Sequence, residues 1–136
     1  MSYKVIDIEG IGHNYAERLK TRCNISTTDE LLEKGGTKRG REKIAAEAEI
    51  PESLILTWVN HADLFRIKGV AGQFSELLEA SGVDSVKEFA ARNPENLHAK
   101  LLQTNEEFGL SGKVPSVESL QAMIENAKTL DARISH

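Results

Sequence analysis

The stretch IEGIGHNYAERL, residues 8 to 19, recurs 59 positions later as IKGVAGQFSELL, residues 67 to 78. In both copies an apolar residue, a glycine, an apolar residue and a small residue lead to an aromatic residue, a small residue and a glutamate. A repeat at this spacing is typical of a duplicated supersecondary unit. The sequence therefore predicts two related helical units, with a first hairpin at Gly10-Ile11-Gly12 and a second hairpin at Gly69-Val70-Ala71-Gly72.

The repeat continues beyond the hairpins into a pair of helix starts. Thr27 with Glu30, and Ser85 with Glu88, have the spacing of a capping box. In a capping box both side chains satisfy free amides at a helix N-terminus. The second pair follows the first by 58 rather than 59 positions, so the first copy carries a one-residue loop insertion. We expect a capped helix after each hairpin.

The remaining apolar residues recur at helical spacing. Helices are expected to start at Pro51, at Asn93-Pro94 and at Pro115-Ser116. The composition of residues 109 to 115 predicts a loop. An apolar stripe places Trp58 in the core. No convincing strand pattern interrupts these helices, so the predicted fold class is all-α.

Composition separates this chain from several protein classes. The 136 residues are 40 % hydrophobic and 28 % charged, which is typical of a globular protein with a core rather than of a disordered one. The net charge of −4 weighs against nucleic acid, because domains that bind nucleic acid usually have a basic surface. A single cysteine, Cys23, excludes an internal disulfide and suits a reducing cytoplasm. No signal region and no apolar run of membrane length is present, so we expect a cytoplasmic protein without a membrane partner.

Hairpins of this kind have a specific physical use. Glycines allow backbone angles that a side chain would obstruct, and the central apolar residue, Ile11 or Val70, anchors the turn in the core. Amides at the start of the following helix then point outward, together with the positive end of its dipole. Such a site suits an anion, for example a phosphate of DNA or RNA. Because the protein main chain contacts only the phosphate, such binding does not depend on the nucleic-acid sequence.

Gly10-Ile11-Gly12 with Tyr15, Ala16 and Leu19 resembles the helix-hairpin-helix motif of DNA repair and recombination proteins. From Ile8 to about Leu130 the chain also resembles a bacterial family, domain of unknown function 4332, most specifically at residues 67–70 and 93–100. The resemblance implies two tandem helix-hairpin-helix units packed as one compact helical domain, which we place at residues 1–66 and 67–136. The wider superfamily implies non-specific DNA binding, sometimes with a monovalent cation held by hairpin carbonyls.

The two hairpins differ in their expected chemistry. The second has Ala71 in place of a glycine and is followed by Glu76 and Glu79, so we interpret it as structural. The first lies in a basic stretch, because residues 13 to 43 hold eight basic and five acidic residues. With the basic loop at residues 35–41, it could cradle two neighbouring phosphates. The predicted nucleic-acid-binding residues are Gly10, Ile11, Gly12, His13, Asn14, Lys38, Arg39 and Arg41.

An enzyme is not expected. His13, His61, His98 and His136 are scattered without metal-ligand spacing, and no nucleophile–base pair or nucleotide-binding loop is recognisable. The helical pattern places His61 on the polar side of its helix. We predict no cofactor and no metal. Two functions stay open: a weak, non-specific DNA-binding module, which we favour, and a protein–protein interaction or scaffold module on the same fold.

Overall fold

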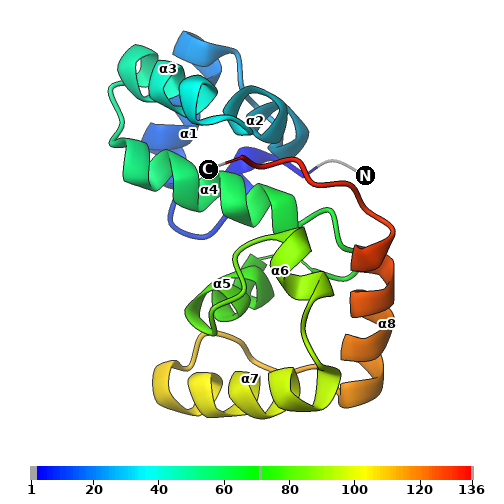
Figure 1. The fold of residues 1–136 in the computed structure, drawn as a ribbon. Coiled ribbons are helices and arrows are strands. Elements are labelled where there is room, and N and C mark those ends of the chain that lie inside the picture. Colours follow the sequence, from blue (N-terminus) through cyan, green and yellow to red (C-terminus); the bar gives the residue numbers. More distant parts are fainter. Residues whose placement is uncertain (1–2, 71, 136) are drawn as a thin grey trace. The chain divides into compact units, whose positions relative to one another are not determined.

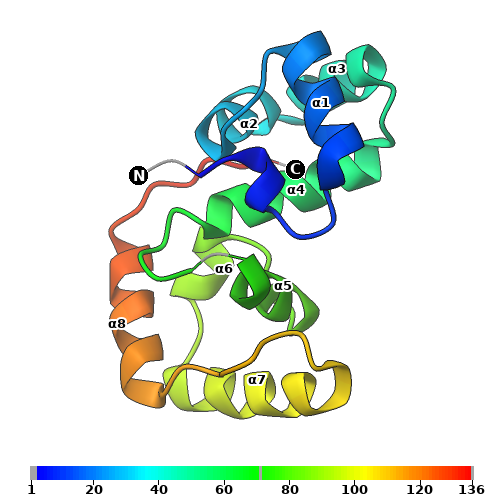
Figure 2. The same ribbon diagram turned by 180° about the vertical axis from the view of Figure 1, so that it is seen from behind.

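The computed structural model describes residues 3–70 and 72–135. Ala71, within the second hairpin, and His136 lie outside the described residues. The all-α prediction is confirmed, since the described chain contains no strand and a single isolated β-bridge joins Lys4 to Thr27. Figures 1 and 2 show the elements from opposite sides. In order they are η1 (Val5–Asp7), α1 (Gly12–Cys23), α2 (Thr28–Gly35), α3 (Lys38–Ala48), α4 (Glu52–Leu64), α5 (Gly72–Ala80), α6 (Val86–Ala90), α7 (Pro94–Phe108) and α8 (Val117–Lys128).

The chain divides into two compact units. Unit 1 runs to Asp63 and takes up the chain again from Arg133, whereas unit 2 is Leu64–Ala132. Unit 2 is therefore an insertion within unit 1. The predicted second unit, residues 67–136, does not keep its last residues, because the main chain of Ser135 bonds to Gly36 in unit 1. The assignment of each unit as a helix-hairpin-helix module stays a prediction.

Equivalent backbone hydrogen bonds shape the two copies of the repeat. Each copy has three of these bonds. One closes the turn before the hairpin, one closes the hairpin itself, and one closes the end of the following helix. The register shift of one residue appears only in the last of the three, as expected. The pairs are Ile8 N–Val5 O (3.0 Å) and Ile67 N–Leu64 O (3.0 Å), Ile11 N–Ile8 O (3.3 Å) and Val70 N–Ile67 O (3.0 Å), and Ile25 N–Leu19 O (3.0 Å) and Val83 N–Leu78 O (2.8 Å).

One of the two predicted capping boxes forms completely. Thr27 Oγ1 accepts from Glu30 N at 3.1 Å, and Glu30 Oε1 accepts from Thr27 N at 3.0 Å. In the second, Ser85 Oγ accepts from Glu88 N at 3.1 Å. The Glu88 carboxylate, however, accepts from the Arg92 guanidinium at 3.0 Å. The second prediction is therefore correct for the serine and wrong for the glutamate, since a cation one turn later recruits the carboxylate.

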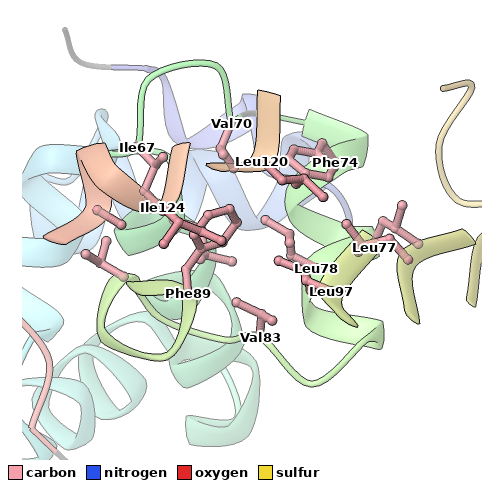
Figure 3. Packing of buried hydrophobic residues seen from close by; sticks show 14 residues of the cluster. Ile67, Val70, Phe74, Leu77, Leu78, Val83, Phe89, Leu97, Leu120 and Ile124 are labelled. Carbon is pink, nitrogen blue, oxygen red and sulfur yellow. The ribbon is translucent and has the colours of Figure 1, made fainter. Parts of the chain in front are cut away.

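Each unit has its own apolar core. Figure 3 shows that of unit 2, where residues of the second hairpin and of α5 pack against Phe89, Leu97, Leu120 and Ile124. In unit 1, Trp58 is buried as predicted, and its ring lies 5.2 Å from the Tyr15 ring. The prediction for His61 is wrong: its side chain is only 2 % exposed, because it lies on the same buried face of α4 as Trp58 and Ala62.

Candidate functional site

The first hairpin leaves its main chain open. Gly10 and Gly12 have φ angles of +90° and +69°, and a Cβ at either position would meet no atom within 4 Å. Between them Ile11 is buried at 2 % exposure and anchors the turn, as predicted. No side chain caps the N-terminus of α1, and its first turn holds no acidic residue. The amides that begin α1 therefore face solvent with the positive end of the helix dipole.

The second hairpin has a similar turn, and α8 lies against its first part, Lys68 and Gly69, whereas a Cβ at Gly72 would meet no atom within 4 Å. Gly69 has a φ of +92°, and a Cβ there would lie 3.2 Å from Met123 Cε. Asn126 Oδ1 accepts a hydrogen bond from Lys68 N at 2.9 Å. The equivalent amide in the first copy belongs to Glu9, which is exposed. In the part of the chain that the structure describes, this Glu9 amide has no acceptor.

A groove of about 420 Å³ opens beside the first hairpin. His13, Glu17 and Lys20 line it from one face of α1, and Lys4 lines it from the segment before η1. Sequence reasoning omitted both lysines from the site. The spacing of His13 and Lys20, two helical turns apart, could have identified Lys20. Lys4 reaches the groove only because its backbone pairs with Thr27.

Most basic side chains of residues 13 to 43 bond to other groups within unit 1. Arg18 donates to Glu49 O at 3.0 Å, and Arg22 pairs with the Glu49 carboxylate at 2.6 Å. This pairing lowers the pKa of Glu49, first through the hydrogen bond and then through the charge of Arg22. Lys34 donates to Cys23 O at 2.9 Å at the end of α1. Among the described residues, three cations of the stretch are exposed without an ion pair or hydrogen bond: Lys20, Lys38 and Arg39.

Lys38 and Arg39 do not join the first hairpin. They begin α3, and Gly40 in the same turn lines a small cavity with Cys23 and Lys34. Cys23 ends α1, whereas the hairpin precedes it, and the 12 residues of α1 span about 18 Å. Figure 2 shows α1 and α3 side by side. The predicted cradle for two neighbouring phosphates therefore does not form, because its two halves lie at opposite ends of α1.

Arg41 has a different position from the one expected. Its side chain is only 2 % exposed, and it donates to Gly35 O at 2.9 Å and to Ser135 O at 2.7 Å. The sequence could not reveal this, since Ser135 lies 94 positions away. Arg41 is thus withdrawn from direct contact with a nucleic-acid phosphate. The exposed site residues are Gly10, Gly12, His13 and Asn14 at one end of α1, and Lys38 and Arg39 at the other.

Cys23 is half-buried, and its Sγ lies 4.0 Å from Ile44 O. Burial raises the pKa of its thiol, and the charge of Glu47 adds to the increase. The thiol therefore stays protonated near neutral pH, in agreement with a structural role. Within residues 3–70 and 72–135, no group of three metal-ligating side chains is found. Over the same residues no helix has the length and apolar character needed to cross a membrane.

Comparison with known proteins gives a family but no described relative. Neither a curated protein nor a solved structure matches the chain. A family model does match, over residues 9–130, which include both hairpins and the eight α-helices of the described residues. The chain therefore belongs to the family described as Domain of unknown function (DUF4332).

Proposed function

We propose that this protein is a non-catalytic module of two helix-hairpin-helix units that binds nucleic-acid phosphates through the main chain of its first hairpin. One observation carries the proposal. In the second hairpin an oxygen, Asn126 Oδ1, already accepts from the Lys68 amide. The matching Glu9 amide has no such acceptor among the described residues. A phosphate oxygen can take in the first hairpin the place that Asn126 Oδ1 holds in the second.

The surroundings of the first hairpin favour an anion. Gly10 and Gly12 have no Cβ to keep a phosphate away from the backbone. The N-terminus of α1 adds the positive end of its dipole, and Lys4 and Lys20 line the adjacent groove. Because the donors are main-chain amides and lysines, the contact reads the phosphate backbone and not the bases.

Lys38 and Arg39 supply a second contact to the same nucleic acid. They share a helical turn with Gly40, which lies beside Cys23 at the far end of α1, and α1 itself is about 18 Å long. A duplex advances about 3.4 Å per base pair along its axis, so the two contacts are roughly five base pairs apart. With two to four cations engaged, the slope of log affinity against log salt is expected at about −2 to −4. The acidic net charge of −4 keeps this binding weak.

The test is a salt titration of duplex-DNA binding, measured by fluorescence anisotropy. His13→Pro removes one amide donor in the first turn of α1, a position where proline is tolerated, and His13→Ala is the matched control that keeps the amide. We expect His13→Pro to weaken binding about tenfold relative to His13→Ala, as the loss of a charge-assisted hydrogen bond requires. Equal affinities of the two variants, or no binding by the unaltered protein at low salt, would refute the proposal.

A protein-interaction function is the second candidate, and α7 is the observation that favours it. Leu102 and Phe108 on this helix are 48 % and 59 % exposed, the large exposed apolar side chains of the described chain. Light scattering of the protein and of a Leu102→Gln, Phe108→Gln variant tests it. If the second function is right, the unaltered protein self-associates or captures a partner, and the variant does not. The His13 variants leave this behaviour unchanged.

A further inference from the structure

The main chain of Ser135 joins the segment Arg133–Ser135 to Gly36 and Arg41. Ser135 N donates to Gly36 O at 2.7 Å, and Ser135 O accepts from Arg41 Nη2 at 2.7 Å. The side chain adds little, since Ser135 Oγ lies 3.5 Å from Gly36 O. We call this segment, the red end of the ribbon in Figure 1, the strap. The two main-chain contacts of Ser135 would be available to almost any residue at position 135.

Gly36 gives the strap the room it needs. A Cβ at position 36 would lie 2.5 Å from Arg133 O and 2.9 Å from Leu32 O. Both of these are backbone atoms, so neither can move aside as the end of a flexible side chain could. Glycine is therefore required at this position for the backbone of the strap to pass so close to the end of α2.

Arg41 links the strap to the end of α2 through its guanidinium. Its guanidinium donates to Gly35 O, one of the last carbonyls of α2, where a positive charge meets the negative end of the helix dipole. This buried guanidinium also donates to the Ser135 carbonyl, and no carboxylate pairs with it among the described residues. Removing the strap would leave a buried cationic donor without that acceptor, which is unfavourable. The vacated position would therefore accept another main-chain carbonyl.

We propose that Gly36 and Arg41 form a clasp that recognises the main chain of an extended segment, and that the strap is its exchangeable intramolecular occupant. Unit 2 is inserted between Asp63 and Arg133, so the strap is the segment by which the chain returns to unit 1. Release of the strap from the clasp opens a site within unit 1 for an extended peptide. This proposal does not depend on nucleic-acid binding.

Proteolysis of two full-length variants tests the strap. Ser135→Pro removes the N–H that bonds to Gly36 O, and Ser135→Ala keeps it. We expect trypsin to cut after Arg133 about tenfold faster in Ser135→Pro than in Ser135→Ala or the unaltered chain, measured by intact mass. Ser135 is exposed, so thermal unfolding monitored by circular dichroism should show both variants folded. Equal cutting rates in all three proteins would overturn the proposal.

A peptide in trans tests the clasp itself. The probe is a labelled peptide of residues 129–136, amidated so that it presents main chain rather than a terminal carboxylate. It should bind the Ser135→Pro chain and bind the Ser135→Ala chain at least tenfold more weakly, because the strap there competes. Adding Gly36→Ala to Ser135→Pro should abolish binding, whereas adding Gly112→Ala, where a Cβ meets no atom within 4 Å, should not. No binding to Ser135→Pro, or binding that survives Gly36→Ala, contradicts the proposed recognition.

Discussion

The first and second hairpins share a turn but differ in what covers it. Gly10 and Gly69 have nearly the same positive φ angle, and the central residues Ile11 and Val70 are both buried. Met123 and Asn126 of α8 lie against Gly69 and Lys68 of the second hairpin, whereas a Cβ at the equivalent Gly10 of the first would meet no atom. A duplicated unit can thus keep the interactions that fold it while one copy closes its turn with its own helix. The copy left open is the one available for a ligand.

Truncation of the residue that begins each turn should have the largest effect. Ile8 and Ile67 are both 1 % exposed and occupy equivalent positions. We expect Ile8→Ala and Ile67→Ala each to lower the free energy of unfolding by about 2–5 kcal/mol, since both leave a cavity in a packed core. Urea denaturation measures it. A large loss of stability in only one of the two variants would show that Ile8 and Ile67 are not packed equivalently, although their backbone hydrogen bonds correspond.

Alanine in place of the turn glycines should distinguish the two hairpins. Gly10→Ala forces a side chain into a positive-φ conformation and should cost about 1–2 kcal/mol, because the space around it is empty. Gly69→Ala adds a contact with Met123 Cε to the same strain and should cost more. Thermal unfolding of the two variants gives the comparison. An equal or larger cost at Gly10 would mean that the first hairpin is covered as well.

The smallest effect concerns Glu30, which completes its capping box whereas Glu88 does not. Hydrogen bonds from the amides of Ser26 and then Thr27 hold the pKa of Glu30 below its ordinary value of 4.5. Its stabilising contribution is therefore complete above pH 4.5 and is lost as the pH falls through the lowered value. Glu30→Gln should reduce the acid sensitivity of unfolding below pH 4.5. Glu33→Gln, on the exposed side of α2, is the control and should behave like the unaltered protein.

Local sequence signals predicted much of the fold. The repeat, the glycine turns, the Thr27 cap and the helix starts at prolines all depend on residues a few positions apart, and such patterns are visible in a single sequence. The reciprocal bond expected of Glu88 failed because Arg92, also only four residues away, competes for the same carboxylate. Local patterns thus identify the groups that can pair but not which pairing wins.

The candidate site was less predictable because its decisive contacts are distant in sequence. Asn126 lies 58 positions from Lys68, and Ser135 lies 94 positions from Arg41. The contact between Asn126 and Lys68 closes the second hairpin, and the contact between Ser135 and Arg41 holds the Arg41 side chain away from the surface. Counting charges along residues 13 to 43 could not show that Arg18, Arg22 and Lys34 are already bonded within unit 1. In the sequence, only the difference between the residues that follow the two hairpins, basic after the first and acidic after the second, indicated that the first hairpin is the one open to a ligand.

The most direct test follows each backbone amide by NMR while inorganic phosphate and then a short DNA duplex are added. We predict saturable shifts for the amides of Glu9, Gly12, His13 and Asn14, and none for Lys68. In an Asn126→Ala variant, which removes the internal acceptor of Lys68, that amide should begin to respond as well. Shifts confined to the second hairpin, equal shifts at both hairpins of the unaltered protein, or none at either would contradict the claim that the first hairpin is the open phosphate site.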